Sequence, residues 1–190
     1  MIHVLRRPSV LVTLPLVLVI LATRVDHFGS AVSLPDATLA AFFLAGLWAR
    51  ARWPFLALLA TAGLADQWAF LQGASAWCVT PAYVFLAPAY ACLSLAGRVS
   101  RNFSLASLAG HARLAVTVLA ACAVAFLISN GSFFLFSGYF AAMSATEYWR
   151  ATARYFLPYT GWAMAYVAFA LAAAAVLSRT VRAARADAGA

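Results

Sequence analysis

The sequence contains no lysine and only five acidic residues among 190, and 9% of its residues are charged. A soluble domain has about 25% charged residues, so this chain has too few charges to cover a surface exposed to water. Intrinsic disorder is excluded as well, because it requires low hydrophobicity and 66% of these residues are apolar. These absences predict an integral membrane protein with little mass outside the bilayer.

Sequence motifs for metal binding and for catalysis are also missing. Cys78, Cys92 and Cys122 are far apart and form no CxxC pattern, so we interpret them as small core residues. His27 follows Asp26, but no second histidine stands at ligand spacing. No HExxH, GxSxG, Walker or GxGxxG motif occurs. We therefore predict no enzyme, no cofactor and no metal, and any uphill transport would need an ion gradient or a separate energising subunit.

Long apolar runs dominate what remains. A membrane-spanning helix needs about 20 mostly apolar residues. We predict an all-α, polytopic membrane protein in which residues 1–190 form a single membrane domain with six helices. The predicted spans are residues 8–25, 34–49, 54–72, 76–96, 113–128 and 158–178. The second and fifth are short and would need protein neighbours or a locally thin bilayer.

The 13 arginines lie between these runs and set the predicted orientation. With the N-terminus inside, ten are cytoplasmic and three are outside. The cytoplasmic set is Arg6, Arg7, Arg50, Arg52, Arg98, Arg101, Arg113, Arg179, Arg182 and Arg185, and the outer set is Arg24, Arg150 and Arg154. This asymmetry follows the positive-inside rule and predicts two cytoplasmic termini, in a bacterial cytoplasmic membrane. It also accounts for the net charge of +8 without a nucleic-acid partner.

Local signals predict where helices begin and bend. Residues 33–36 (Ser-Leu-Pro-Asp) are typical of a capping box opening the second span, and residues 144–147 (Ser-Ala-Thr-Glu) predict another before a short helix. Pro88 falls inside the fourth span and predicts a kink. Residues 130–143 are aromatic and too short to span. They are expected to lie in the outer interface or to dip back into the protein, either as an aromatic belt or as a wall for a ligand.

A row of small residues runs along the second predicted span. It consists of Ala37, Ala41, Ala45 and Ala49, spaced four residues apart. Such spacing lets helix backbones approach closely in lipid. The row is either a packing face within this chain or an interface with another membrane subunit, and the sequence leaves both open.

Four of the five acids fall on the outer half of this topology, and Asp66 is the most informative. It lies inside the third span, where a carboxylate is costly and should face protein or water with a partner. Candidate partners are Arg24 and His27 at the outer end of the first span, and Arg150 or Arg154 in the last outer loop. Asp66 is then either one member of a structural ion pair or part of a substrate or ion site.

Aromatic and polar residues gather at the depth of Asp66 and predict a pocket that is open to the outside. Indole and phenol faces would supply contact area, while carboxylate and amide groups would orient a flat or ring-bearing solute. The predicted substrate-binding residues are Asp66, Gln67, Trp68, His27, Trp77, Asn130, Tyr139, Glu147 and Trp149.

In size, span count and its row at Ala37, Ala41, Ala45 and Ala49, the chain resembles the substrate-binding S components of energy-coupling-factor vitamin transporters. The resemblance implies a partner membrane subunit with two cytoplasmic ATPases, and the alanine row as the coupling face. It also implies capture of a vitamin or related micronutrient at the outer side, with cobalamin or a precursor as the first candidate and thiamine-type rings next.

Two other classes of function stay open. A non-catalytic structural or assembly subunit of a larger membrane complex would use the alanine row and the outer aromatic loop as contacts, with Asp66 in a buried ion pair. A small oligomeric channel or exporter is the third class. It is disfavoured because no line of polar residues runs the full length of a span.

Overall fold

The protein is described by a computed structural model over residues 9–24, 34–73, 75, 77 and 79–187. Within this part of the chain all regular structure is helical, which confirms the all-α class. The elements are α1 (Ser9–Thr23), α2 (Thr38–Trp48), α3 (Trp53–Leu71), the 3-10 helix η2 (Pro81–Phe85), α4 (Leu86–Ser100), α5 (Leu108–Phe136), α6 (Ala145–Ala153) and α7 (Phe156–Asp187).

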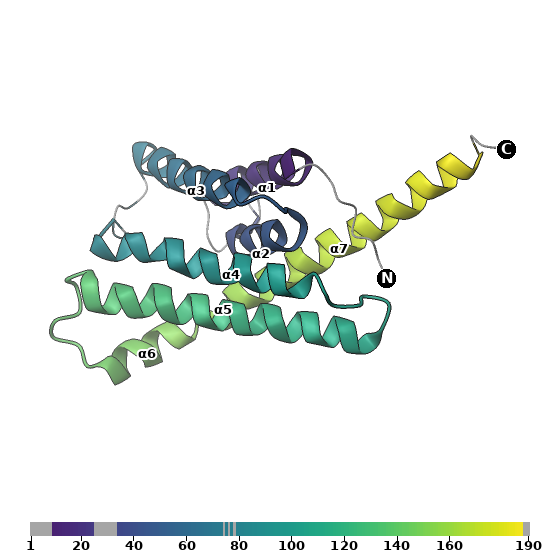
Figure 1. Ribbon diagram of the computed structural model, residues 1–190. Helices are drawn as coiled ribbons and strands as arrows, with labels where there is room; N and C mark the ends of the chain where they lie inside the picture. The colour runs from purple at the N-terminus through teal and green to yellow at the C-terminus, as the bar shows by residue number, and fades with distance from the viewer. Residues whose placement is uncertain (1–8, 25–33, 74, 76, 78, 188–190) are drawn as a thin grey trace.

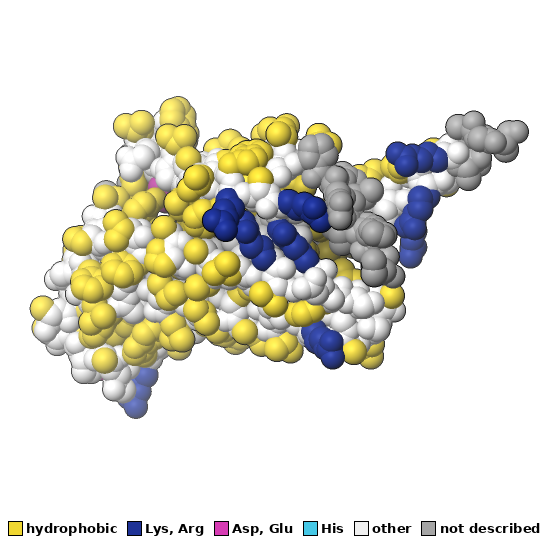
Figure 2. Space-filling model, viewed as in Figure 1, with side chains coloured by type: hydrophobic (Ala, Val, Ile, Leu, Met, Phe, Trp, Pro, Cys, Tyr) yellow, Lys and Arg dark blue, Asp and Glu magenta, His cyan; other side chains and the backbone are white. Residues whose placement is uncertain are grey.

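Helix length and composition support a membrane protein. Four segments of the described chain are long and apolar enough to cross a bilayer, namely Trp53–Leu71, Pro81–Ser100, Leu108–Phe136 and Phe156–Arg185. Apolar side chains are spread over the whole face of the bundle shown in Figure 2. A surface of this kind is stable in lipid and not in water, so the chain is an integral membrane protein.

Six helical segments correspond to the six predicted spans, but three differ in length from the prediction by five residues or more. The sixth, predicted over 158–178, is α7 with 32 residues. The fifth, predicted over 113–128, is α5 with 29 residues, because the helix continues through Asn130 and Gly131 to Phe136. One glycine inside a helix costs only about 1 kcal/mol, which the surrounding apolar residues outweigh. The second, α2, has 11 residues and is too short to cross a bilayer alone.

The short helix α2 forms the centre of the bundle. In Figure 1 it lies between the pair α1 and α3 and the pair α4 and α5, while α7 runs along the far side of the bundle and extends beyond it. Nine of its 11 residues are buried. Phe42 and Phe43 are fully enclosed, which makes α2 the core of the fold. A helix surrounded by protein can be shorter than the bilayer because its ends never meet lipid.

The alanine row lies inside the chain, which corrects the expectation of a coupling face. Ala37, Ala41, Ala45 and Ala49 are each at most 4% exposed. No outside subunit can reach these side chains in this structure. Of the two alternatives, the row is thus a packing face, because every side of α2 already contacts other helices of the same chain.

The two predicted capping boxes have different outcomes. The box at Ser144 is confirmed: its hydroxyl accepts a hydrogen bond from the Glu147 amide, and the Glu147 carboxylate accepts one from the Ser144 amide at 2.9 Å. The box over 33–36 is wrong for the residues described, because α2 begins at Thr38 and its N-cap residue, Ala37, has no side-chain cap. Asp36 instead accepts from the Thr38 amide at 2.8 Å, and Ser33 lies outside the described residues.

Two further expectations need correction. Pro88 causes no kink in the middle of a helix, because α4 begins at Leu86 and places this proline in its first turn. A proline is tolerated there, since the first amides of a helix have no partner within it. Residues 130–143 are not one interfacial segment, because α5 includes residues up to Phe136 and only the remainder is a loop.

We refer to the two ends of the bundle by their landmark residues. The Asp66 end is where α3 finishes and η2 begins, and the Arg101 end is where α2 and α4 finish. At the latter, Arg101 closes the C-terminus of α2: its guanidinium donates to the carbonyls of Gly46, Leu47 and Ala49, with an Nε to Gly46 O distance of 2.9 Å. A cation here also stabilises the negative end of the helix dipole.

The capping box gives a local prediction for α6. Replacing Ser144 with alanine removes the acceptor for the Glu147 amide, and we expect roughly fivefold faster amide hydrogen exchange in α6. Hydrogen exchange read by mass spectrometry measures this. Ser144→Thr keeps the hydroxyl and should exchange as the wild type does. Equal exchange in the alanine variant and the wild type would show that packing alone holds α6.

Candidate functional site

Asp66 is paired with Arg24, one of the partners that the sequence suggested. The guanidinium of Arg24 meets the carboxylate of Asp66 in a two-pronged contact, Nε to Oδ1 and Nη2 to Oδ2, both at 2.8 Å. Nε also donates to the Ala62 carbonyl, one turn before Asp66 in α3, at 3.2 Å. Both residues are buried, Arg24 being 5% and Asp66 8% exposed. The pair joins the end of α1 to α3.

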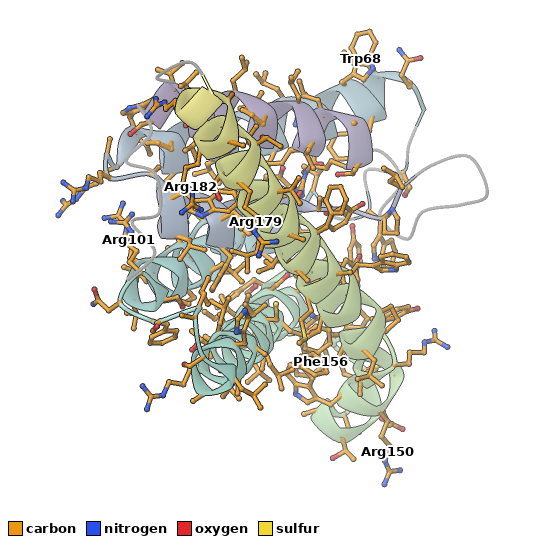
Figure 3. The ribbon with its side chains drawn as sticks, turned by 90° about the vertical axis from the view of Figure 1, so that its right-hand side faces the viewer. Trp68, Arg101, Arg150, Phe156, Arg179 and Arg182 are labelled. Atoms are coloured by element: carbon orange, nitrogen blue, oxygen red, sulfur yellow. The ribbon has the colours of Figure 1, made fainter. Side chains whose placement is uncertain are left out.

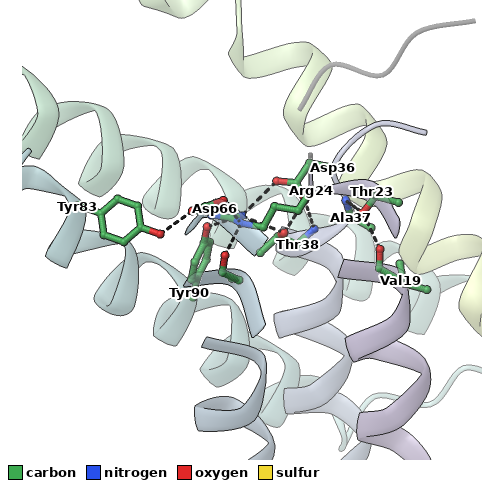
Figure 4. Close-up of polar contacts among 10 residues, drawn as sticks. Val19, Thr23, Arg24, Asp36, Ala37, Thr38, Asp66, Tyr83 and Tyr90 are labelled. Atoms are coloured by element: carbon green, nitrogen blue, oxygen red, sulfur yellow. Dashed lines mark hydrogen bonds and ion pairs between the residues drawn. The ribbon is translucent and has the colours of Figure 1, made fainter. Parts of the chain in front are cut away.

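The remaining guanidinium nitrogen of Arg24 reaches α2 and α4. Nη1 donates to Thr38 Oγ1 and to Tyr90 Oη, each at 3.1 Å, and lies 3.4 Å from Asp36 Oδ2. The Thr38 hydroxyl donates in turn to Asp36. Figure 4 shows this arrangement, with Arg24 between Asp66 and Asp36. One side chain therefore ties four helices together at the Asp66 end.

Two tyrosines complete the cluster from η2 and α4. The Tyr83 hydroxyl donates to Asp66 Oδ2 at 2.5 Å. The ring of Tyr90 is stacked on Phe42 of α2, with a centroid distance of 4.4 Å and an angle of 10°. The two residues are seven positions apart, which places them on one face of the continuous helical segment from η2 into α4. We call Arg24, Asp36, Thr38, Asp66, Tyr83 and Tyr90 the Arg24 cluster.

Local sequence explains why Arg24 points inward. Thr23 donates to the carbonyl of Val19 at 2.8 Å and accepts from the amide of Ala37 at 3.1 Å. These bonds fasten the last turn of α1 to the residue before α2. The Arg24 amide bonds to the Ile20 carbonyl and extends the helical turn, so its side chain enters the bundle instead of the bilayer.

The Arg24 cluster combines one positive with two negative formal charges in a buried place. Such groups are stable only when they are paired and hydrogen-bonded. Within the described chain, every buried polar side-chain atom that is not accessible to solvent has a hydrogen-bond partner. The network therefore meets the conditions that a buried charge needs, and removing one member would leave the others uncompensated.

A pocket lies beside the cluster, between α3 and the η2–α4 segment. It has a volume of about 300 Å³, at the lower limit for small-molecule sites. Its polar lining comes from Arg24, Tyr83 and Tyr90. The remaining walls are apolar or lack a side chain: Leu59, Ala62, Gly63, Val84, Leu86 and Ala87. In Figure 2 a small part of one acidic side chain shows near α3.

No protein-family model matches this chain, and no curated protein matches it. The geometry of the Arg24 cluster and its pocket is therefore what the functional interpretation rests on.

The structure does not bring together the eight predicted pocket residues that it describes. Asp66 is in the Arg24 cluster. Gln67 and Trp68, the next two residues of α3, are on the exposed surface of this helix, and Trp68 is 60% exposed. Figure 3 shows Trp68 pointing away from the bundle. These residues were grouped by their depth along the helix, but the side-chain direction changes by about 100° from one helical residue to the next. His27 lies outside the described residues.

The other predicted residues form a separate aromatic cluster around the end of α5. Trp77 is stacked on Tyr139 with a centroid distance of 3.8 Å, and both rings are half-exposed. Asn130 donates to the Phe126 carbonyl within α5, and its own carbonyl accepts from Tyr148. Glu147 serves the α6 cap, and Trp149 contacts the ring of Tyr148. These residues pack the α5–α6 corner, away from the Arg24 cluster.

Thr38, Tyr83 and Tyr90 were missed by the sequence analysis. The spacing of the two tyrosines was the available signal, because position i+7 returns to the same helix face.

Metal binding finds no support in the described residues, where no three histidine, cysteine, aspartate or glutamate side chains come together.

Proposed function

We propose that this protein is a membrane-embedded solute-binding subunit of an uptake system, which captures a small ring-bearing nutrient at the Asp66 end. In this proposal six helices cross or enter a bacterial cytoplasmic membrane, both termini are cytoplasmic, and the Asp66 end faces outside. Separate subunits, a membrane partner with cytoplasmic ATPases, supply the energy. The arginine distribution supports the orientation, and the missing nucleotide motif supports the separate energy source.

The observation that carries the proposal is the pocket beside the Arg24 cluster. Apolar walls with a few convergent polar groups at one end are typical of small-molecule sites. Tyr83 and Tyr90 offer ring faces and hydroxyls, and Arg24 adds a positive charge at the pocket wall. A volume of about 300 Å³ holds a single ring system or one arm of a larger molecule such as cobalamin.

A structural subunit is the second candidate, because the Arg24 cluster is satisfied by its own hydrogen bonds. A structural subunit would need the Arg24 cluster for folding, and its pocket would have no function. The two candidates thus differ in whether filling the pocket has a functional consequence.

Gly63 provides the test. Gly63 lines the pocket, and a Cβ built on it meets no atom within 4 Å, so Gly63→Leu adds a bulky side chain at an open position of the pocket wall. We expect this variant to fold normally and to lose at least about tenfold in affinity for the retained solute, because a bulky side chain replaces the contact surface of the ligand. Native mass spectrometry of the purified protein, with cobalamin and thiamine added as probes, measures the affinity.

Gly161 is the matched control, since its Cβ position is equally open but it lies in α7 and does not line the pocket. Gly161→Leu should bind as the wild type does. If neither the wild type nor the variants retain a small molecule, or if Gly63→Leu binds normally, the solute-binding proposal fails and the structural subunit is favoured.

A further inference from the structure

The Arg101 end of the bundle carries four arginines, and within the described residues none of them forms an ion pair with an acidic side chain. Figure 2 shows dark blue side chains gathered over the junction of α3 with the end of α4, with no acidic side chain beside them. Arg50 and Arg52 precede α3, and Arg98 and Arg101 end α4. We call these four residues the arginine patch.

The charges of the patch are close together and are not neutralised by the described protein. Within the described residues, the ion pairs found join Arg24 to Asp36 and Asp66, at the opposite end. Burial, followed by the charges of Arg98 and Arg50, lowers the pKa of Arg101. Arg98 and Arg101 are directed to backbone carbonyls around the end of α2. Several like charges in one place attract a multivalent or phosphate-bearing anion.

The position of the patch determines which anion fits. Arg98 stands in the last turn of the candidate span Pro81–Ser100, and Arg52 directly precedes the candidate span Trp53–Leu71. Residues at these positions lie at the level of the lipid headgroups. Trp53, 43% exposed, is an aromatic residue of the kind that anchors helices at this level.

Apolar side chains continue from the patch toward the middle of the same helices. Leu95 is 60% exposed and lies three residues before Arg98, while Leu56 is 63% exposed and lies four residues after Arg52. Each pair shares one helix face. A molecule with a phosphate at one end and an apolar chain at the other matches this surface. We infer that the arginine patch binds the headgroup of an anionic phospholipid whose acyl chains lie along α3 and α4.

Arginine suits this role better than lysine, because its planar guanidinium binds two phosphate oxygens at once. The inference is independent of the proposed solute pocket, which lies at the other end. It predicts that the full-length protein in neutral detergent binds phosphatidylglycerol in preference to phosphatidylcholine with the same acyl chains. Native mass spectrometry during lipid titration measures both affinities.

The double variant Arg50→Gln/Arg98→Gln tests the patch while leaving the Arg101 cap of α2 in place. We expect its affinity for phosphatidylglycerol to fall roughly 20-fold, because each arginine near the membrane surface contributes to the affinity for anionic lipid and two are removed. The matched control Arg150→Gln/Arg154→Gln removes the same charge from the α6 region and should bind as the wild type does. Arg50→Gln alone, at an exposed side chain, should weaken binding about fivefold and covers the case in which the double variant misfolds.

Three results would overturn the inference. They are equal binding of phosphatidylglycerol and phosphatidylcholine, unchanged affinity in the patch variants, and equal loss in the control variant. Inorganic phosphate added as a competitor separates the lipid from a soluble anion. Displacement of the lipid at equimolar phosphate would assign the patch to a free anion instead.

Discussion

Replacing Arg24 with methionine is expected to destabilise the protein by about 3–5 kcal/mol, because removing one partner leaves the other as an unpaired buried charge. The carboxylate of Asp66 would keep its place among buried residues and lose two hydrogen bonds of 2.8 Å. Methionine has a similar length and fills most of the space, so the loss reflects charge and hydrogen bonding more than a cavity. Unfolding in a detergent or denaturant titration, followed by circular dichroism, measures the change.

The control for Arg24→Met is Arg150→Met, which removes the same charge from an exposed position in α6. We expect that change to cost at most about 0.5 kcal/mol. A double variant, Arg24→Met/Asp66→Leu, should recover much of the lost stability, because a buried ion pair can often be replaced by apolar residues. If Arg24→Met unfolds as the control does, the Arg24 cluster does not hold the four helices together.

Arg24→Met also separates folding from binding when the protein is studied at a temperature where the variant stays folded. Arg24 lines the pocket as well as bridging the helices. Under the proposed function it should lose solute affinity even when its helicity is unchanged. If the role of Arg24 is only structural, the variant should change the unfolding transition, and no solute binding should be detected in either the variant or the wild type.

The sequence was sufficient to predict the class of protein and to show that Asp66 needs a buried partner. Six apolar runs correspond to helical segments. Because a carboxylate inside a span is costly, a partner for Asp66 was expected, and Arg24 was among the candidates. The outcome at Ser144 was also predictable, because a capping box is encoded in four adjacent residues. These predictions depend on composition or on short-range spacing, which the sequence contains directly.

The membership of the site was not predictable in the same way. Trp68 and Asp66 lie close together along α3 but project in different directions, and only packing decides which of them faces protein. Tyr83 and Tyr90 contact Arg24 and Asp66 through separations of 17 to 66 residues in the chain. The alanine row was ambiguous for a related reason: small residues permit a close approach, and the sequence does not say which helix approaches.

A backbone-to-backbone contact between α2 and α4 leads to the prediction with the largest expected effect. A Cβ built on Gly97 of α4 would lie 2.1 Å from the Phe43 carbonyl oxygen and 2.8 Å from the Leu47 amide nitrogen of α2. On the other side, a Cβ on Gly46 would lie 2.0 Å from the Ser94 carbonyl oxygen. Both contacts are with backbone atoms, which cannot rotate away. The two backbones therefore touch, as small residues permit in membrane helix pairs.

Gly97→Ala adds one methyl group at this contact and is expected to cost more than about 4 kcal/mol, or to prevent folding, because α2 and α4 must separate to make room. Gly63→Ala is the matched change at an open helical position. It should stabilise the protein by about 0.5–1 kcal/mol, because alanine favours helix over glycine. Yield of folded protein and the midpoint of unfolding compare the two variants. Opposite signs of the stability change for the same glycine-to-alanine substitution would show that backbone contact, and not helix propensity, decides the effect at Gly97. A stable Gly97→Ala protein would contradict the placement of α2 against α4.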